Sequence, residues 1–139
     1  MNQIIRLDTR GRLVIPNEFR EPLGLKDGDE VLMNLDTTTN TISITPVYGK
    51  PADLVKIDIE FGDTPGCLAK IATKIATLKI DLIMSESRSS KRGQKARWDI
   101  IADISKSKIS INTIKQKLMQ SGLVESVTIT KIARDRRYR

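Results

Sequence analysis

Apolar residues in the second half of the chain follow alternating and helical spacings that predict a βαββαβ succession. Residues 55–61 alternate strictly between apolar and polar side chains, which indicates a strand with one buried face. Apolar residues at helical spacing predict helices over 67–79 and 111–118. The remaining alternating segments, at 80–87, 97–105 and 124–132, are predicted as strands. This order is the split arrangement of ferredoxin-like folds.

The first half of the chain has a different pattern. We predict two strands, 4–11 and 12–16, with a turn at Arg10-Gly11, and then a short helix that begins at Pro16 and ends by Gly24. A hairpin follows, with strands at 31–35 and 41–47. A segment of about 50 residues buries little apolar surface on its own, so we expect it to be completed by a second copy of the chain.

The stretch "YGKPAD" separates the two patterns and is predicted to be a linker, because it contains Gly49 and Pro51. We therefore predict an α+β protein with an N-terminal β-rich dimerising domain and a C-terminal ferredoxin-like βαββαβ domain. The predicted boundaries are 1–48 for the first domain, 49–54 for the linker, 55–132 for the second domain and 133–139 for a basic tail.

Charge is distributed unevenly along the 139 residues, which carry a formal net charge of +7. Residues 1–50 hold six Lys or Arg against seven Asp or Glu, whereas residues 51–139 hold 18 against 10. Two stretches, 88–97 and 131–139, contribute five basic residues each. We read 88–97 as a loop between two strands. Either stretch could contact DNA, or could simply be solvated.

The composition excludes several kinds of chemistry. The chain has no histidine, the commonest general base and metal ligand, and its single Cys67 cannot form an intrachain disulfide. No nucleophile–base set is apparent, so we expect no enzymatic activity, no metal and no cofactor. No stretch approaches the roughly 20 apolar residues of a membrane span, and no secretory signal is visible. We expect a cytoplasmic protein without a membrane partner.

Eleven residues between positions 8 and 29 carry a motif at fixed spacing: Asp8, Gly11, Arg12, Val14, Ile15, Pro16, Arg20, Leu23, Gly24, Gly28 and Asp29. With it, residues 3–47 resemble the AbrB/SpoVT swapped-hairpin family. The resemblance implies an intertwined homodimer, or a higher homo-oligomer, that binds double-stranded DNA. Arg12 and Arg20 match DNA-contacting positions of the family, and Arg6 and Arg10 lie near such positions. Glu21 departs from the pattern, because DNA-binding members often have a basic residue there.

A two-fold dimer would present two copies of these arginines, and phosphate neutralisation by such a set gives affinity without sequence information. The alternative is that the arginines pair with Asp8, Glu18 and Glu21 on an ordinary solvated face.

The loop "DTPG" introduces the first predicted helix of the second domain. With it, residues 55–132 resemble an ACT domain, a small module that senses amino acids and other metabolites. The resemblance implies an effector site, for which the candidate residues are Asp63, Thr64, Pro65, Gly66, Cys67, Leu68 and Asp81. Asp81 departs from the family, in which asparagine is common at that place. A domain that only dimerises is the alternative.

The two resemblances together predict a DNA-binding transcriptional regulator that responds to a small-molecule effector, most simply an amino acid. Two alternatives stay open. One is an antitoxin-like or adaptor dimer. The other is a regulatory subunit of an amino-acid biosynthetic enzyme, with an ACT domain that holds no ligand.

Overall fold

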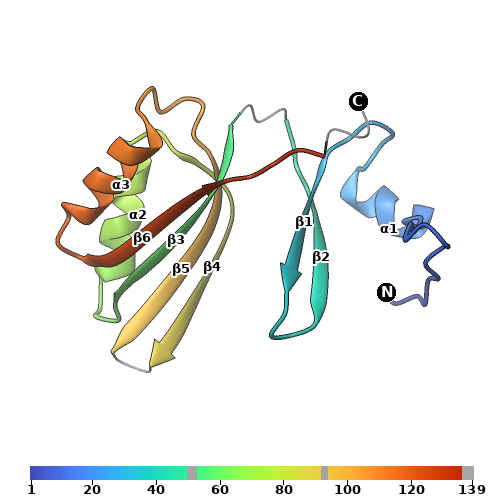
Figure 1. The fold of residues 1–139 in the computed structure, drawn as a ribbon, viewed down its shortest axis with the longest axis horizontal. Coiled ribbons are helices and arrows are strands. Elements are labelled where there is room, and N and C mark those ends of the chain that lie inside the picture. The colour runs from blue at the N-terminus through green and yellow to red at the C-terminus, as the bar shows by residue number, and fades with distance from the viewer. Residues whose placement is uncertain (50–52, 92–93, 136–139) are drawn as a thin grey trace. The chain divides into compact units, whose positions relative to one another are not determined.

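The computed structural model describes residues 1–49, 53–91 and 94–135, and the chain forms two compact units, Met1–Gly49 and Lys50–Arg139 (Figure 1). Parts of the predicted linker (50–52), of the basic stretch 88–97 (92–93) and of the basic tail (136–139) lie outside the described residues. The mixed α+β fold class is confirmed, with a strand hairpin in the first unit and a βαββαβ succession in the second.

The first unit begins with an irregular segment and two short helical turns, α1 (Asn17–Arg20) and η1 (Glu21–Leu23). Pro16 precedes α1 with the extended backbone of a helix N-cap, and Pro22 lies at the start of η1, where its missing N–H costs no hydrogen bond. Gly24 ends η1 in the left-handed conformation, with φ of 67°. The predicted short helix is therefore present, as two turns.

The hairpin of the first unit pairs β1 (Val31–Asp36) with β2 (Thr41–Pro46) in antiparallel register. Residues directly opposite each other share a face, and one face is wholly apolar. It is built from the pairs Val31 with Pro46, Met33 with Ile44, and Leu35 with Ile42. Met33 and Leu35 remain 64% and 67% exposed in the single chain. The other face carries mostly polar partners, such as Asn34 with Ser43.

The predicted strands at 4–11 and 12–16 are not strands in this structure. Only the turn between them forms, where the Asp8 N–H donates to the Arg12 carbonyl at 2.9 Å and the Gly11 N–H donates to Asp8 at 3.0 Å. A strand needs a neighbouring strand and a buried face, and the single chain supplies neither to this segment. Its apolar side chains, including Ile4, Leu7 and Val14, are exposed.

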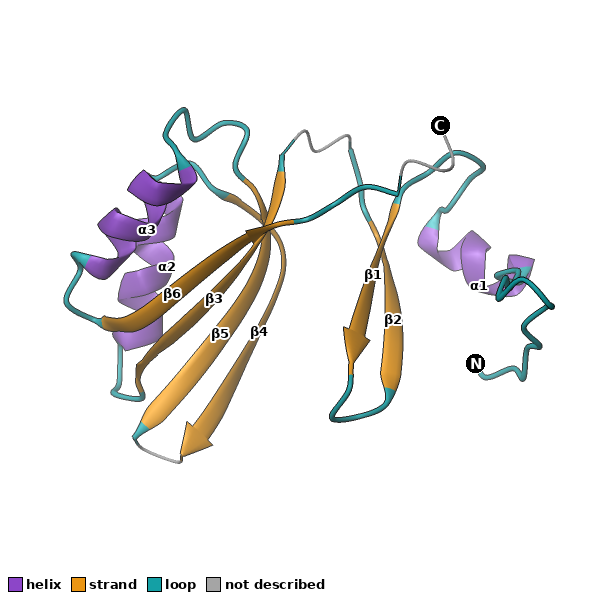
Figure 2. Ribbon diagram, viewed as in Figure 1, coloured by secondary structure: helices purple, strands orange, loops and turns teal. Residues whose placement is uncertain are grey.

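The second unit is a four-stranded antiparallel sheet covered on one face by two helices (Figure 2). Its elements are β3 (Leu54–Gly62), α2 (Cys67–Thr77), β4 (Asp81–Lys91), β5 (Lys95–Asp103), α3 (Ile111–Met119) and β6 (Val124–Lys131). The strand order is β4-β5-β3-β6, so β3 and β5 lie at the centre. The predicted ferredoxin-like order of elements is present.

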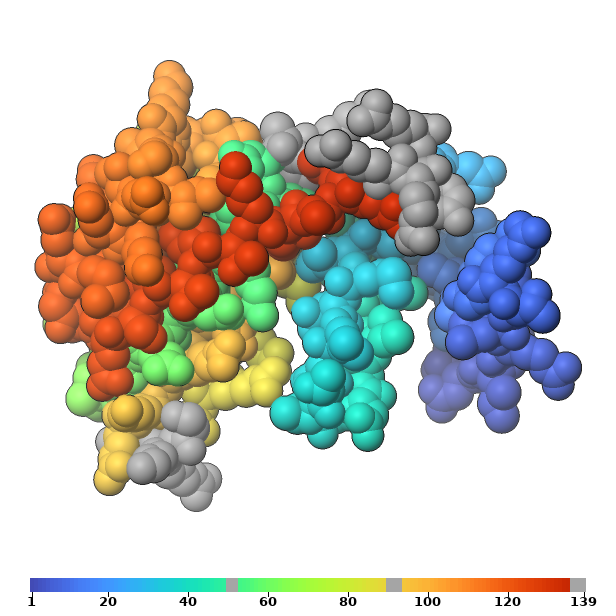
Figure 3. All heavy atoms as spheres, in the orientation of Figure 1, coloured from blue at the N-terminus to red at the C-terminus, as the bar shows by residue number. Residues whose placement is uncertain are grey.

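Side chains of the sheet and the two helices fill the space between the elements of the second unit (Figure 3). The alternation predicted for 55–61 is confirmed, because every second residue of β3 is buried. The largest fully buried side chains are Val55, Ile57, Ile59, Ile71, Ile75, Ile100, Ile114 and Leu118. No residue of the first unit, all of which is described, is buried to the same degree.

The basic stretch 88–97 is mostly strand, so its prediction as a loop was wrong. β4 continues to Lys91 and β5 begins at Lys95, and Arg88 lies opposite Arg97 in the register. Lys and Arg side chains extend away from a hairpin with the charged groups in water, so a high density of basic residues does not end a strand. Arg88, Lys95 and Arg97 therefore lie on the paired strands near the end of a long hairpin.

The exposed apolar face of the β1–β2 hairpin predicts association of the chain with a second copy. We expect Leu35→Glu to shift the full-length protein to monomers, because burying an unpaired carboxylate costs several kcal/mol. The measurement is molar mass by light scattering.

Asn34→Glu is the matched control, since it adds the same charge to the polar face of the same strand and should leave association intact. A parent chain that is monomeric and folded would contradict this prediction.

Candidate nucleic-acid interface and ligand pocket

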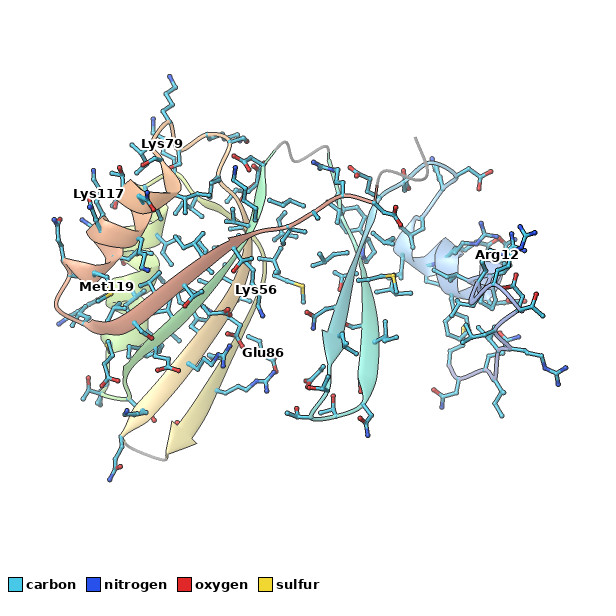
Figure 4. All side chains as sticks on the ribbon, viewed as in Figure 1. Arg12, Lys56, Lys79, Glu86, Lys117 and Met119 are labelled. Carbon is cyan, nitrogen blue, oxygen red and sulfur yellow. The ribbon has the colours of Figure 1, made fainter. Side chains whose placement is uncertain are left out.

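Asp8 organises the turn that carries two of the four predicted DNA-contacting arginines. Its Oδ1 accepts the backbone N–H groups of Arg10 and Arg12, each at 2.9 Å. Its Oδ2 accepts a 2.6 Å charge-assisted hydrogen bond from Nε of Arg12. The turn and the Arg12 side chain are thus fixed by one carboxylate (Figure 4).

These contacts keep the Asp8 carboxylate charged. The backbone N–H of Arg12, and then its side chain, hold the pKa of Asp8 below the ordinary value of 3.8. The Arg12 side chain nevertheless stays 62% exposed. The contact through Nε therefore leaves the guanidinium accessible to an external anion.

Arg20 is held at the end of α1 by neighbours on the same unit. Its Nη2 donates to Oδ1 of Asn17 at 2.7 Å, and its Nη1 lies 3.9 Å from Oδ1 of Asp27. Arg6 and Arg10 are exposed residues of the irregular segment. The structure therefore gives Arg12 and Arg20 defined positions, and it brings the backbone of Arg10 to Asp8.

The charges of the first unit are segregated along its sequence. Residues 1–20 hold four arginines against two acidic residues, whereas residues 21–49 hold one lysine against five acidic residues. One of the two acids in the first stretch, Asp8, is engaged by Arg12. The small negative net charge of the whole unit thus hides a basic N-terminal stretch.

Five of the seven predicted effector residues line a pocket of about 310 Å³ in the second unit. It lies beside the loop between β3 and α2, against the far part of β4. Its lining comprises Phe61, Asp63, Thr64, Pro65, Gly66, Leu68, Ser87, Arg88, Ser89 and Ala96. A carboxylate, a guanidinium and three hydroxyl groups therefore meet an apolar wall, a mixture typical of small-molecule sites.

Contacts across the pocket fix the loop that carries the Asp-Thr-Pro-Gly sequence. Oδ2 of Asp63 accepts a 2.6 Å hydrogen bond from Oγ of Ser89, which ties the loop to β4. Gly66 precedes α2 in the left-handed conformation, with φ of 83°, and a side chain there would meet open space. Glycine is therefore favoured at position 66, because other residues rarely adopt this backbone conformation, and it adds no side chain to the pocket lining.

Two of the predicted effector residues lie outside this pocket. Cys67 is buried, and its Sγ lies 3.8 Å from the Leu123 carbonyl oxygen, to which it donates. Asp81 begins β4 and pairs with Asp103, about 20 Å along the strand from the pocket residue Ser87. A single chain therefore does not bring Asp81 to the other candidates.

The pocket residues of β4 and β5 were missed in the sequence. Ser87, Arg88 and Ser89 lie at the end of a strand that was predicted to stop at position 87. The ferredoxin-like order was a usable signal, because it places the start of β5 between the end of β4 and the end of β3.

No helix in the described part of the chain is both long and apolar enough to cross a membrane. Residues 1–49, 53–91 and 94–135 contain no group of three or more His, Cys, Asp or Glu that could hold a metal ion.

The lowered pKa of Asp8 predicts a pH window for the stability of the turn. The pKa of Asp8 is lower in the folded state than the 3.8 of the unfolded chain, so the ionised carboxylate stabilises the folded state. This contribution is complete above pH 3.8 and is lost as the pH falls through the pKa of the folded state. We expect the Asp8 carboxyl to titrate below 3.8 by NMR.

Asp8→Asn keeps an acceptor for the backbone N–H groups but removes the ion pair. The free energy of unfolding of this variant should therefore be lower than that of the parent at neutral pH, and the difference should disappear as the pH falls below the folded pKa of Asp8. An Asp8 that titrates at or above 3.8 would contradict this.

Comparisons with known proteins give a family match for the first unit and several solved structures that are similar to part of the chain. Residues 4–47 match the family described as "Antidote-toxin recognition MazE, bacterial antitoxin". Comparison with curated proteins gives no match. Similar solved structures include an ACT domain protein from Streptococcus pneumoniae, at 17% identity over 58% of this chain and 90% of that chain, with a TM-score of 0.48. Another is the C-terminal domain of the MgtC protein from Mycobacterium tuberculosis, at 9% identity over 62% and 94%, with a TM-score of 0.48. The first unit is therefore similar to the MazE antitoxin family.

Proposed function

We propose that this protein is a DNA-binding regulator that acts as a dimer and responds to a small-molecule effector. The observation that carries the proposal is the arginine-bearing turn at Asp8–Arg12, which lies within the segment that matches the MazE family. The exposed apolar face of the hairpin supports the dimer. The proposed role is binding, without a catalytic step.

The arginines would act by neutralising DNA phosphates. A guanidinium binds phosphate oxygens through paired N–H donors, and Arg12 remains exposed while its Nε is held by Asp8. Two copies related by a dimer axis would double the number of contacts. Counterion release from the duplex then supplies affinity that falls steeply with salt.

The pocket beside the Asp-Thr-Pro-Gly loop is proposed as the effector site. Its lining includes the carboxylate of Asp63, which accepts from Ser89, and the guanidinium of Arg88, which pairs with Glu86 at 3.2 Å. The two ends of a zwitterion would share these groups with their present partners. Phe61, Pro65 and Leu68 supply apolar contact for a side chain. These features suit a free amino acid. Binding of the effector would change DNA affinity by about 5- to 150-fold if the two sites are coupled.

A second candidate function is that of an antitoxin, favoured by the description of the matching family. In that case the partner would be a toxin protein, and the second unit would serve as an adaptor. The discriminating test is coexpression with the product of an adjacent gene. Relief of a growth arrest caused by that product supports the antitoxin. A chain that binds neither DNA nor a toxin would favour a regulatory subunit of a biosynthetic enzyme.

DNA binding is tested with Arg12→Ala and Arg20→Ala in the full-length chain. Each variant should bind a duplex about tenfold more weakly, because a charge-assisted hydrogen bond contributes about 1.5 kcal/mol or more. The slope of log affinity against log salt should fall by about 1 for each phosphate contact that is lost. The measurement is fluorescence anisotropy of a labelled duplex over a range of salt concentrations.

Two controls accompany these variants. Lys26→Ala removes a positive charge from the acidic turn of the same unit and should leave binding nearly unchanged. Arg12→Ala alone leaves the Asp8 carboxylate without its ion-pair partner, and that carboxylate could itself repel DNA. The double variant Asp8→Asn with Arg12→Gln removes both charges, so a loss of DNA binding in it is caused by the missing arginine. Arginine variants that bind like the parent at about 0.1 M salt would rule out this interface.

Effector binding is tested by thermal-shift screening with free amino acids, followed by Leu68→Glu. A ligand that binds only the native state raises its melting temperature, by an amount that grows with ligand concentration. A carboxylate at position 68 would stand in the pocket wall and repel the ligand's own carboxylate. We expect the shift to be lost, together with any effect of the ligand on DNA affinity.

Ala69→Glu is the matched control, because it places the same charge one residue along α2, outside the pocket lining. It should keep the thermal shift. Gly66→Val is less informative, since its φ of 83° strains any side chain whether or not a ligand binds. The pocket is not the effector site if Leu68→Glu and Ala69→Glu behave alike.

A further inference from the structure

A second pocket, of about 220 Å³, lies at the opposite end of α2 from the proposed effector pocket. Its lining comprises Thr77, Leu78, Lys79, Lys106, Ser107, Lys108, Ile109 and Lys117. These residues come from the end of α2, from the loop that leads into α3, and from α3 itself. The 11 residues of α2 span about 16 Å, so the two pockets are separate sites.

Four lysines surround this second pocket, which we call the lysine pocket: Lys79, Lys106, Lys108 and Lys117. Lys79 and Lys117 lie together at one end of the helical layer (Figure 4). Among the described residues, none of the four forms an ion pair within 4.0 Å. Like charges gathered without ion-pair partners repel one another, and a bound anion would relieve that repulsion.

One residue of the lining of the lysine pocket, Ser107, has a side-chain hydroxyl that the described residues leave without a hydrogen-bond partner. Ser107 is 4% exposed and is the one buried polar residue in the described part of the chain. Its backbone is satisfied, since its N–H donates to the Ile104 carbonyl and its carbonyl accepts from Ile109. Its buried Oγ has no hydrogen-bond partner among the described residues. A buried hydroxyl in that state costs free energy unless a ligand completes it.

The lysines are not needed to cap the end of α2. The last carbonyls of the helix already accept hydrogen bonds from the chain, as Leu78 donates to Lys74 and Lys79 donates to Ala76. The nearby acid Asp103 interacts with one of the four lysines. Burial would raise the pKa of Asp103, but the hydrogen bond from Ser105 and, to a smaller extent, the charge of Lys106 outweigh this effect and hold the pKa below 3.8. Asp103 therefore offsets part of the charge of Lys106, although no ion pair within 4.0 Å forms between them.

We propose that the lysine pocket binds a small phosphorylated compound that carries two or more negative charges. The lysine ammonium groups would hold the phosphate oxygens, and the Ser107 hydroxyl, which is almost inaccessible in the ligand-free chain, would donate to one of them after its side chain turns toward the pocket. The volume of the pocket is below the roughly 300 Å³ of drug-sized sites, which suits a compact anion. The site stands on residues of the second unit alone and does not depend on DNA binding by the first.

The test uses tripolyphosphate as the probe and the full-length chain, with affinity measured by calorimetry. The double variant Lys106→Gln with Lys108→Gln should weaken binding about tenfold or more, since two charge-assisted contacts are lost. Lys70→Gln with Lys115→Gln is the matched control, because it removes two exposed lysines of the same unit that do not line the pocket. The control should retain the affinity of the parent.

Ser107→Ala separates a binding role from a structural one. Removing an unpartnered buried hydroxyl should raise the melting temperature of the ligand-free protein and weaken tripolyphosphate binding several-fold. A role in folding alone would leave the affinity unchanged.

Three outcomes would overturn the proposal. The first is a parent chain that does not bind tripolyphosphate. The second is an equal loss of tripolyphosphate affinity in the two double variants, Lys106→Gln with Lys108→Gln and Lys70→Gln with Lys115→Gln. The third is a Lys106→Gln with Lys108→Gln variant that binds duplex DNA more weakly but holds tripolyphosphate like the parent. That result would identify the pocket as a contact to the DNA backbone.

Discussion

The need to cover apolar strand faces governs both units of this chain. In the second unit α2 and α3 cover one face of the sheet, and large aliphatic residues such as Ile57 and Ile100 become fully buried. The β1–β2 hairpin has a comparable apolar face, yet the 49 residues of its unit contain no helix long enough to cover it. A two-stranded hairpin is marginally stable alone, so the proposed partner chain supplies what the sequence of one chain lacks.

Carboxylates decide where positive charge remains available to a ligand. Asp8 accepts both backbone N–H groups and the Nε of Arg12, so it fixes the turn while most of the Arg12 side chain stays exposed. On the face of the sheet that no helix of the described residues covers, Arg97 instead forms an ion pair with Asp99 at 2.8 Å and lies 3.6 Å from Asp58. Burial raises the pKa of Asp58, and its neighbour Asp99 adds to this effect. The lysines around Ser107 have no comparable partners among the described residues, which distinguishes them from this network.

The sequence located the Asp-Thr-Pro-Gly loop between a strand and a helix, but it could not locate the whole pocket beside that loop. Asp63 to Gly66 are contiguous, so their proximity is fixed by the backbone. Arg88 and Ser89 reach the same place only because β4 and β5 form a longer hairpin than the charge pattern suggested. The lysine pocket is similar, since Lys79 and Lys117 are 38 positions apart and are brought together by the packing of two helices. Spacing along the chain carries little information about such pairs.

The sequence by itself determined the two-unit organisation, the βαββαβ order and the buried faces of β3 and β5. It did not do so for β4, where Leu82 is 41% exposed. Alternating residues such as Val55 and Ile57 must leave water on one side, and this requirement acts locally. Only the tertiary structure decided that 4–16 stays irregular in a single chain, that Cys67 packs inward, and that Ser107 is buried without a partner. Each of these three features depends on which segments, distant in the sequence, lie beside the residue in the folded chain. The local pattern of apolar and polar side chains does not contain this information.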